Sequence, residues 1–571
     1  MLIHRKFILS KLFHCNYSNF NFVVTNLQHR KYFPNVQCRS CHSINEKNIR
    51  SILLSLNTRK SIENEVMYKN VKLIGWVQSV RKHKSRVFCN ISDGSSPFDL
   101  QVVIFPSETT EKITVGCALL VQGDIYPIPD NLKTSQLSID KPSFQCPGEL
   151  HAKSVTILDN EKQPEEFTFK NLVNNVSLPI THDVPTKNQM TSSVGRHGPR
   201  PDPGVLRSTE GLSMRHRLPE FGAMLRMRAH VKQLVRRVMS DCDYLEVDTP
   251  ILTSTDCEGT GQMFKVQAPL SDETGKPGGS SIFLTGSAQM HLESLALGLS
   301  KVYTLNPTFR AENSNTRYHL AEFYMLEAES VYLDSIDTLC TEIEMLIKKV
   351  LSQCLEIYPI PGNNELNALQ HDLVLIRTFL GSRSESGSHC TNASIDCALE
   401  MRDVLESMLR QPFIRISYDE AIEHLNKKMN KTDLTSSEIQ DLSKKDEHRI
   451  LDWVGGNRPV FITHFPIKLK PFYCQSIDGT KAECTDLLFP GIGELVGASV
   501  RESCPSLLKS HMKSSDYFTN HSQWYIDLRN TGGAPHSGFG LGFERLLQFL
   551  LGITNIRDTI AFPRSAYKVV F

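Results

Sequence analysis

Short runs of hydrophobic residues follow one another from residue 70 to residue 155. The runs VKLIGWVQSV, RVFCNISDGSSPFDLQVVI and CALLVQGDIY are rich in Val, Ile, Leu and Phe and are broken by Gly, Asp and Ser. Such runs, separated by turn residues, are typical of short β-strands. They predict a small antiparallel β-barrel, which we place at 68–158.

The pattern changes after residue 158. The stretch TKNQMTSSVGRHGPRPDPG is polar and contains Gly and Pro, so 159–215 is predicted to be a linker or hinge with a polar insertion. Apolar residues then recur at helical spacing in FGAMLRMRAHVKQLVRRVMS, which predicts an amphipathic helix. Strands alternate irregularly with helices from there on. A second domain is therefore expected at 216–571, with a polar, Ser-rich surface insertion near 360–400.

Composition adds a prediction for the N-terminus. The chain carries 63 Lys and Arg against 62 Asp and Glu, and this balance neither requires nor excludes a nucleic-acid partner. Residues 1–45 contain no acidic residue but several Arg, Lys and Ser, which is typical of a mitochondrial transit peptide. A disordered basic tail that contacts RNA is the alternative. The location expected is the mitochondrial matrix.

Two further features of the composition bear on the compartment. The 15 Cys are scattered, which favours reduced thiols inside a cell. No apolar run approaches the roughly 18 residues of a membrane-spanning helix, so no membrane insertion is expected.

Candidate chemistry begins in FRAENSNTRYHLAEFYMLEAE, residues 309–329, where charged and amide side chains separate two partly apolar stretches. In a strand, Arg310 and Glu312 would project from one face. An Arg in that position can clamp a phosphate or carboxylate through two parallel bonds. Phe323, on the return strand, could stack on a nucleotide base. A surface hairpin with a solvated tip is the alternative.

A second candidate is HSGFGLGFERLLQFLLG, residues 536–552. In a strand, Gly538, Gly540 and Gly542 share one face, and a bare glycine face allows a planar ligand to lie on the backbone. Arg545, near the start of the following helix, could reach the same ligand. A glycine face that only packs on a neighbouring strand is the alternative.

A third candidate is DLLFPGIGELVGASVRE, residues 486–502, where Asp486 and Glu494 stand among apolar residues and glycines. Oxygen ligands suit a Mg²⁺ ion that bridges phosphates. Buried carboxylates are costly unless they are paired or bound to a cation, so an internal salt bridge is the alternative.

Together these stretches resemble the motifs of class II aminoacyl-tRNA synthetases of the aspartyl, asparaginyl and lysyl subgroup. The runs YLEVDTPILTSTDCEG, FRAENSNTRYHLAEF and GFGLGFERLL stand in the family's order. The resemblance implies an α+β fold, in which an OB-fold barrel precedes a catalytic domain with an antiparallel sheet flanked by helices. It also implies ATP and Mg²⁺ as cofactors and a homodimer with Pro250 at its interface.

The resemblance assigns roles to individual positions. Catalysis would depend on Arg310, Glu312 and Arg545. The remaining assignments are ATP binding by Arg310, Glu312, Arg317, His319, Leu320, Phe323, Glu494, Gly542 and Arg545; metal binding by Asp486, Glu494 and Ser499; amino-acid binding by Glu258, Ser287, Gln289 and Arg501; and anticodon binding by Arg81, Phe88 and Gln101. For the anticodon residues, a solvated basic loop beside a core Phe is the alternative.

The amino acid is inferred from FLTGSAQMHLE, residues 283–293. Where aspartyl enzymes carry a Lys for the substrate carboxylate, this chain has Leu292, which favours a neutral amide. HLAEF and GELVGASVRE also resemble asparaginyl-tRNA synthetases, particularly mitochondrial ones. We therefore expect an asparagine–tRNA ligase that forms asparaginyl-AMP from asparagine and ATP and charges tRNA(Asn).

Two departures from the family pattern leave other functions open. In the family, the run that corresponds to FRAENSNTRYHLAEF usually has Arg directly before the His, where this chain has Tyr318 before His319. Ala498 replaces a residue that is usually Gly. The alternatives are an aspartyl or relaxed Asp/Asn specificity, an ammonia-using asparagine synthetase, and a catalytically degenerate RNA-binding relative. The predicted barrel argues against the ammonia-using asparagine synthetase.

Overall fold

The computed structural model describes the chain in segments: 48–57, 66–128, 148–158, 207–257, 263–267, 282–314, 316–363, 366–380, 391–429, 441–454, 458–514 and 523–565. The predicted transit peptide, 1–45, and most of the predicted linker, 159–206, lie outside these residues. None of the described helices is long and apolar enough to cross a membrane. Every cysteine in the described segments is free of a disulfide.

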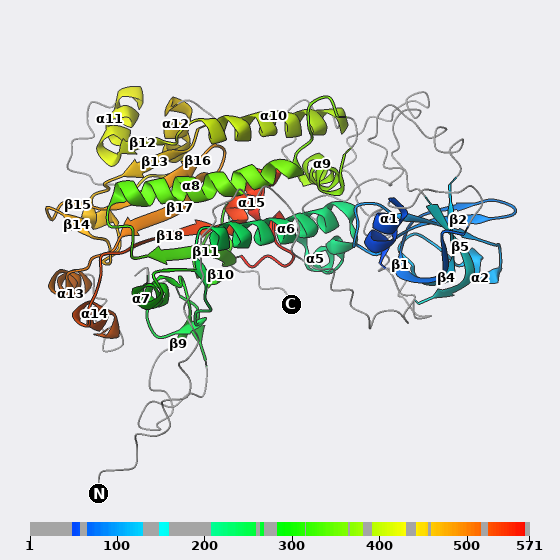
Figure 1. The fold of residues 1–571 in the computed structure, drawn as a ribbon, viewed down its shortest axis with the longest axis horizontal. Coiled ribbons are helices and arrows are strands. Elements are labelled where there is room, and N and C mark those ends of the chain that lie inside the picture. The colour runs from blue at the N-terminus through cyan, green and yellow to red at the C-terminus, as the bar shows by residue number, and fades with distance from the viewer. Residues whose placement is uncertain are drawn as a thin grey trace, which may run out of the picture. The chain divides into compact units, whose positions relative to one another are not determined.

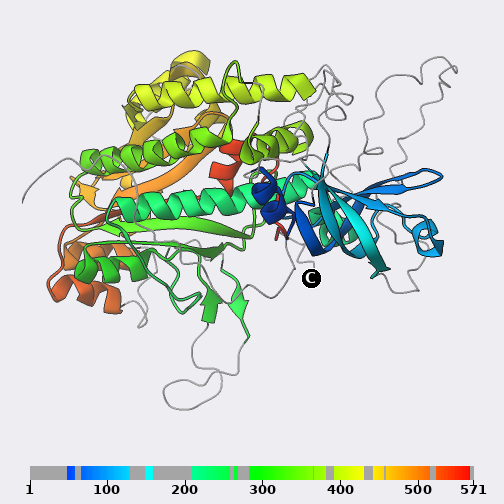
Figure 2. The ribbon, with the colours of Figure 1, turned by 45° about the vertical axis from the view of Figure 1, so that its right-hand side comes forward.

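The predicted β-barrel is confirmed. Five strands close in the order β1-β2-β3-β5-β4, with bounds β1 Tyr68–Lys82, β2 Val87–Ser92, β3 Leu100–Ile104, β4 Ala118–Pro127 and β5 Gly148–Ile157. Figure 2 shows these strands in blue and cyan. All pairs are antiparallel except β3 with β5. Buried and part-buried positions alternate along β2, as a strand with one face on a core requires.

A helix that the sequence reading did not predict completes the barrel core. Helix α1, Ile49–Asn57, buries Ile49, Ile52 and Leu56 among the barrel's apolar side chains. Its first backbone N–H groups are bound by side chains of the barrel, since Asp93 accepts from Ile49 N at 2.7 Å. A short helix, α2 (Glu108–Glu111), lies between β3 and β4.

The second domain is built on an eight-stranded sheet in the order β12-β13-β16-β17-β18-β11-β10-β6. The strand bounds are β6 Leu245–Glu246, β10 Lys301–Phe309, β11 Glu322–Ser330, β12 Ile414–Ser417, β13 Val460–Thr463, β16 Cys484–Phe489, β17 Gly493–Val500 and β18 Ser537–Gly542. The six central strands are antiparallel, as predicted, whereas β12 and β6 pair in parallel at the two edges. Smaller sheets contain β7 (Leu252–Thr253), β8 (Lys265–Val266) and β9 (Ile282–Leu284), and β14 (Ser476–Ile477) with β15 (Lys481–Ala482).

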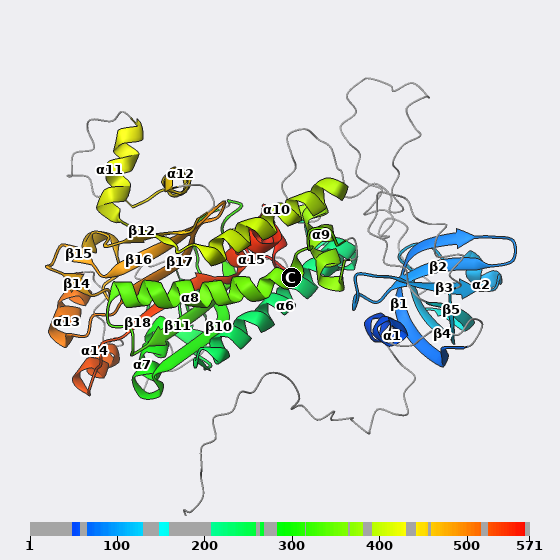
Figure 3. The ribbon, with the colours of Figure 1, turned by 45° about the horizontal axis from the view of Figure 1, so that its top comes forward.

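Long helices cover one face of this sheet. Helix α6, Pro219–Asp241, confirms the predicted amphipathic helix and buries Met224, Met227 and Val231. It runs with α8, Ile336–Cys354, along the sheet in Figures 1 and 3. Together with α15, Phe543–Leu551, they enclose the largest hydrophobic core.

The remaining helices surround this framework. Their bounds are α5 Thr209–Met214, α7 Gln289–Leu299, α9 Ala368–Leu380, α10 Thr391–Arg410, α11 Tyr418–Met429, α12 Lys444–Val454, α13 Pro505–Ser514 and α14 Gln523–Asn530. Helix α7 packs on β10 and β11, and α12 packs on β16 and β17.

The stretch near 360–400, where a polar surface insertion was predicted, contains two helices and buried apolar residues. Helices α9 and α10 occupy most of it, and Leu373, Ile376 and Ala398 are fully buried in the main core. The Ser-rich composition belongs to the short stretch 381–390, outside the described residues, and it concealed the helical spacing on either side.

Candidate active site

A cavity of about 720 Å³ opens on the sheet beside β11, β17 and β18. It brings together side chains from the three candidate stretches, which are far apart in the sequence. The predicted site residues that line it are Ser287, Gln289, Arg310, Glu312, His319, Leu320, Phe323, Asp486, Glu494, Ser499, Arg501, Gly542 and Arg545. Arg317 is not among its lining residues, and Glu258 lies outside the described residues.

Arg310 and Glu312 lie in the loop after the end of β10 rather than within the strand, which corrects the expectation that they project from one face of a strand. The Arg310 guanidinium lies 5.5 Å from the centre of the Phe323 ring. Its Nη1 is 3.8 Å from Glu312, and Glu312 is 3.9 Å from His319. The hairpin thus presents a cation beside an aromatic face, as predicted.

The tip of the hairpin orders His319. Its Nδ1 atom lies 3.0 Å from the Ser314 hydroxyl and 2.6 Å from the Thr316 hydroxyl. Burial lowers the pKa of His319, which keeps the imidazole neutral at physiological pH. Arg317 is exposed, with its guanidinium over the ring of Tyr318 at 4.9 Å, so Tyr318 and not Arg317 faces the cavity.

The glycine face of β18 is present, but side chains cover part of it. A Cβ atom built on Gly538 would lie 2.0 Å from a carboxylate oxygen of Glu329, and one on Gly540 would lie 2.6 Å from the Met325 methyl group. Of the three glycines on this face of β18, Gly540 and Gly542 line the cavity and Gly538 does not. The first glycine therefore makes room for a protein carboxylate rather than for a ligand.

Arg545 extends from the start of α15 to β17. Its Nη1 donates to the backbone carbonyl of Glu494 at 2.8 Å and lies 3.6 Å from the Glu494 carboxylate. Burial opposes ionisation of Glu494, but Arg545, Lys444 and other nearby cations hold the pKa of this carboxyl below its usual range.

The second predicted metal ligand, Asp486, is paired with a residue that the sequence reading missed. Lys470 donates to both oxygens of Asp486, at 2.9 and 2.7 Å. Enclosure raises the pKa of Asp486 to about 6, although Lys470 opposes the shift. A Cβ atom on Gly497 would lie 3.5 Å from Glu494 Oε1 and 4.0 Å from Asp486 Oδ1, so the two carboxylates flank this glycine.

These two carboxylates could hold a cation only with help from a substrate. Within the described segments, no group of three or more His, Cys, Asp or Glu side chains is arranged to bind a metal. Mg²⁺ commonly takes one or two protein carboxylates and completes its shell with phosphates and water. Ser499, the third predicted ligand, is buried and accepts a bond from Arg501 at 2.6 Å.

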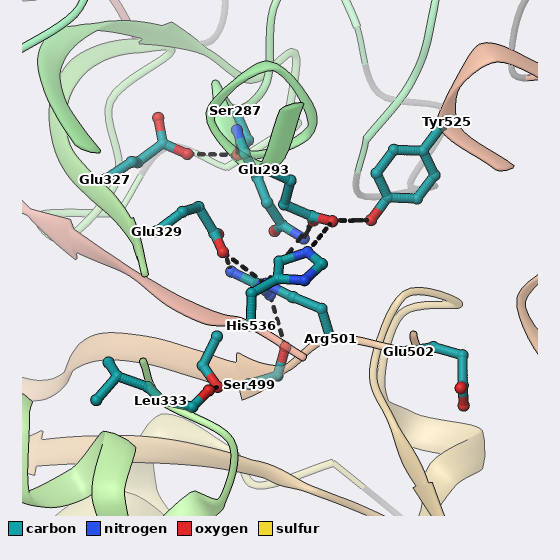
Figure 4. A network of polar contacts seen from close by, with 12 residues as sticks. Ser287, Glu293, Glu327, Glu329, Leu333, Ser499, Arg501, Glu502, Tyr525 and His536 are labelled. Atoms are coloured by element: carbon teal, nitrogen blue, oxygen red, sulfur yellow. Dashed lines mark hydrogen bonds and ion pairs between the residues drawn. The ribbon is translucent and has the colours of Figure 1, made fainter. Parts of the chain in front are cut away.

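A network of buried charges, drawn in Figure 4, includes the lining residues Glu329, Ser499 and Arg501 and extends beyond the cavity to Glu293. Arg501 bonds Ser499 and pairs with both oxygens of Glu329. Glu293, which is fully buried, accepts bonds from Tyr525 at 2.7 Å and from Arg529 at 2.6 Å. His536 lies 3.0 Å from Glu293. Burial raises the pKa of Glu293, but Arg529, His536 and Arg501 outweigh burial and lower it.

Glu327 joins this network from the neighbouring position on β11. It accepts a short hydrogen bond from the Ser287 hydroxyl and bonds from the backbone N–H of Ala288. Burial raises the pKa of Glu327. Gln289 lies beside it at the start of α7 and donates to Glu293 at 3.0 Å.

Leu292 does not have the position that the sequence argument gave it. Its side chain is fully buried with Ala288, Ala296 and Val302, and it is not a lining residue of the cavity. Arg501 lines the cavity and Leu292 does not, so Leu292 cannot set the polarity of the cavity wall.

The sequence reading missed Glu293, Glu327, Glu329 and Lys470. A signal for two of them was available, because Glu327 and Glu329 alternate in an otherwise apolar strand, which directs both carboxylates to one face. Glu293 and Lys470 offered none, since their partners come from α14 and β16, far away in the sequence.

The predicted anticodon residues lie together on the barrel. Arg81 donates to Gln101 at 3.1 Å, and its guanidinium lies 5.8 Å from the Phe88 ring. Gln101 in turn donates to Glu149 at 2.6 Å. This face combines a cation, an amide that both donates and accepts hydrogen bonds, and an aromatic ring. Proteins use these groups to bind unstacked bases.

Comparisons with known proteins agree with this arrangement. Residues 209–566 match the family model described as tRNA synthetases class II (D, K and N), and 71–158 match an OB-fold nucleic acid binding domain. The chain is 33% identical to asparaginyl-tRNA synthetase of Mus musculus, with 87% of this chain and 90% of the relative covered. It is 32% identical to the mitochondrial asparagine–tRNA ligase of Saccharomyces cerevisiae, with 90% and 96% covered.

A solved structure is similar over most of its length. It is the asparaginyl-tRNA synthetase of Pyrococcus horikoshii complexed with asparaginyl-adenylate, with a TM-score of 0.62 and 25% identity, covering 89% of this chain and 99% of that one. The chain therefore belongs to the class II tRNA synthetases of the D, K and N group and, within it, to the asparaginyl-tRNA synthetases, the asparagine–tRNA ligases.

Proposed function

We propose that the cavity joins asparagine to ATP, forming asparaginyl-AMP and pyrophosphate, and then transfers the asparaginyl group to the 3′ end of tRNA(Asn). The main support is that one cavity holds the Arg310 hairpin at one end and the Arg501 network at the other. The reaction needs no protein nucleophile. It needs two substrates held in line and a phosphorus centre whose developing charge is neutralised.

At the nucleotide end, Arg310 holds the α-phosphate and Glu312 lies on the adenine side of ATP. Phe323 stacks on one face of the adenine and Arg545 lies on the other. The support is the position of the two guanidinium groups, which reach the cavity from two different parts of the chain, the loop after β10 and the first turn of α15. A guanidinium and an aromatic ring each bind a flat π-system well.

At the amino-acid end, charge favours asparagine over aspartate. Three buried carboxylates, on Glu293, Glu327 and Glu329, face two guanidinium groups, on Arg501 and Arg529. Burial already raises the pKa of Glu327 and of Glu329. A further carboxylate from aspartate would meet the same penalty, whereas an amide can donate to a carboxylate and accept from Arg501.

Mg²⁺ fits the other side of the cavity when ATP brings phosphate oxygens. Asp486 and Glu494 would hold it, with the Ser499 hydroxyl nearby, and the ion would neutralise phosphate charge. Lys470 must then release or share Asp486, because it occupies both oxygens of that carboxylate.

The barrel supplies the second recognition site for the tRNA. Phe88 stacks on an unstacked anticodon base, Gln101 reads its edge, and Arg81 holds a nearby phosphate. The support is the direct contact between Arg81 and Gln101 beside the Phe88 ring.

Two chains are proposed to form a homodimer through the segment around Pro250, which belongs to the run YLEVDTPILTSTDCEG. Pro250 is exposed there, and Leu245 and Leu252 expose 52% and 54% of their surface. Apolar residues clustered on a surface favour an interface with another protein.

The mitochondrial matrix is the proposed compartment. The support is the acid-free, basic composition of residues 1–45 and the likeness to a mitochondrial yeast relative. Import of the full chain into isolated mitochondria, with shortening of its N-terminus, is expected. A chain lacking residues 1–45 that is imported equally well would contradict this assignment.

The activity is tested by exchange of labelled pyrophosphate into ATP. Exchange should require asparagine and should not require tRNA. A purified, folded chain that binds tRNA but shows no exchange would favour the degenerate RNA-binding alternative.

A further inference from the structure

Lys444 lies at the cavity outside the three family motifs. It is the first residue of α12, and the cavity is also lined by Asp441 and Leu442 just before that helix. The Lys444 side chain keeps 29% of its surface exposed. It is thus a cation at the edge of the nucleotide end that none of the roles above uses.

A lysine at the first position of a helix needs a reason other than helix stability. The N-terminus carries partial positive charge, which disfavours cations there. The Ser443 hydroxyl accepts the backbone N–H of Asp446, and Asp446 and Glu447 supply the acidic first turn that the helix dipole favours. Lys444 opposes this pattern.

The contacts of Lys444 direct it toward β17. Its Nζ atom donates to Glu447 Oε2 at 2.7 Å, and the same oxygen accepts the backbone N–H of Glu494 at 2.7 Å. A Cβ atom on Gly493 would lie 2.2 Å from Glu447 Oε2 and 3.3 Å from Lys444 Nζ. Gly493, with φ of +78°, therefore allows the ion pair to lie against the start of the strand.

The positive charge of Lys444 reaches the groups around the nucleotide. Burial raises the pKa of Glu494, and Lys444 is, after Arg545, among the cations that outweigh burial and lower it. Lys444 also contributes to the lowered pKa of His319. Lys444 thus stands on the side of the cavity shared by Glu494, Arg545 and the hairpin tip.

This side of the cavity has lost a cation that the family motif would supply. Tyr318 lines the cavity at the position where the motif has Arg, and Arg317 is exposed and not a lining residue. We propose that Lys444 binds the β- and γ-phosphate oxygens of ATP and supplies the positive charge that Tyr318 does not. The inference rests on the proposed activation reaction.

The step that Lys444 would assist is the departure of pyrophosphate. A carboxylate oxygen of asparagine forms a bond to the α-phosphorus while the bond from that phosphorus to the bridging oxygen breaks. Pyrophosphate leaves with the electron pair, and no proton is transferred. Lys444 neutralises the charge that builds up on the departing group.

The test compares Lys444→Met with Lys445→Met, a matched control in which the neighbouring exposed lysine of the same helix is replaced. Lys444→Met should raise the KM for ATP in the forward reaction and for pyrophosphate in the reverse reaction by about 10- to 100-fold. The KM for asparagine and transfer from preformed asparaginyl-AMP to tRNA should stay within about twofold. Lys444→Arg should retain most of the affinity.

A second substitution separates phosphate binding from a purely structural ion pair with Glu447. Tyr318→Arg, which restores a cation at the hairpin tip, should recover pyrophosphate binding in the Lys444→Met background. Equal KM values for Lys444→Met and Lys445→Met in an active enzyme would overturn the inference, and so would failure of Tyr318→Arg to recover binding. Absence of exchange in the unaltered chain would instead refute the proposed function.

Discussion

Single charged residues at the cavity already have partners of opposite charge in the absence of substrate. Arg310 lies near Glu312, Glu494 near Arg545, and Arg501 is held by Glu329. Such pairs fix side chains before substrates arrive, so less reorganisation is needed at the reacting centre. They also mean that a substitution leaves a charged partner exposed to the substrate.

Arg310→Ala should reduce kcat/KM for pyrophosphate exchange by about 100- to 1,000-fold, because it removes the proposed donor to the α-phosphate. The thermal unfolding midpoint should change little, since Arg310 lies in a loop with 32% of its side chain exposed. Arg317→Ala is the control, because Arg317 is exposed outside the cavity. Unaltered exchange by Arg310→Ala would refute the role given to the hairpin.

The proposed Mg²⁺ ligand Asp486 should make the Mg²⁺ requirement depend on pH. Its pKa is raised to about 6 by enclosure, and only the deprotonated form binds a cation. The Mg²⁺ concentration for half-maximal exchange should therefore rise as pH falls from 7.5 through 6. Asp486→Asn should require high Mg²⁺ at every pH. A requirement in the unaltered chain that is constant from pH 7.5 to 5.5 would exclude Asp486 as a ligand.

At the scale of elements, the missing side chain of a glycine in β18 makes room for the charge network at the proposed amino-acid end of the cavity. Strand β18 lies between β11 and β17, and Gly538 faces Glu329 across the sheet. The missing side chain gives the Glu329 carboxylate its place beside Arg501. The element thus controls the charge network through close approach of backbone and carboxylate.

Gly538→Ala should displace Glu329 and weaken asparagine binding more than ATP binding. Overpacking at this position should also cost about 1–3 kcal/mol of unfolding free energy. Gly540→Ala is a useful comparison for stability, because its Cβ would meet only the flexible end of Met325. A Gly538→Ala enzyme with normal stability and a normal KM for asparagine would contradict this account.

The barrel makes a separate prediction. Phe88→Ala should raise the KM for tRNA(Asn) by about 10-fold, in line with the loss of one base-stacking contact. Pyrophosphate exchange without tRNA should be unchanged, since Phe88 belongs to the barrel and not to the cavity lining. A parallel loss of exchange would show that the substitution damages the fold instead.

The elements that the sequence predicted best are those whose pattern is local. The barrel strands, helix α6 and the glycine strand all have a periodicity that requires no distant partner. Helices α9 and α10 were missed because the polar stretch at 381–390 obscured the spacing of Leu373 and Ile376. Leu292 was misplaced because alignment gives a position along the chain but not the direction of a side chain.

At the scale of the whole molecule, the sequence predicts two domains with different functions, a barrel of the nucleic-acid-binding OB-fold type and a synthetase catalytic domain. The family assignment rests on a match that extends over 209–566, and the barrel match covers 71–158. The sequence could not show the charge balance of the buried network beside the cavity. Glu293, Arg501 and Arg529 meet only when α7, the residue after β17 and α14 come together in the fold.

We propose that this charge balance selects asparagine over aspartate. The most direct test is charging of mitochondrial tRNA(Asn) by the chain lacking residues 1–45, with asparagine and aspartate compared at equal concentrations. We expect the enzyme to charge the tRNA with asparagine. The kcat/KM with aspartate should be lower by at least about 100-fold, because aspartate brings an unpaired charge into a buried site. Comparable charging with both amino acids, or charging with aspartate alone, would contradict it.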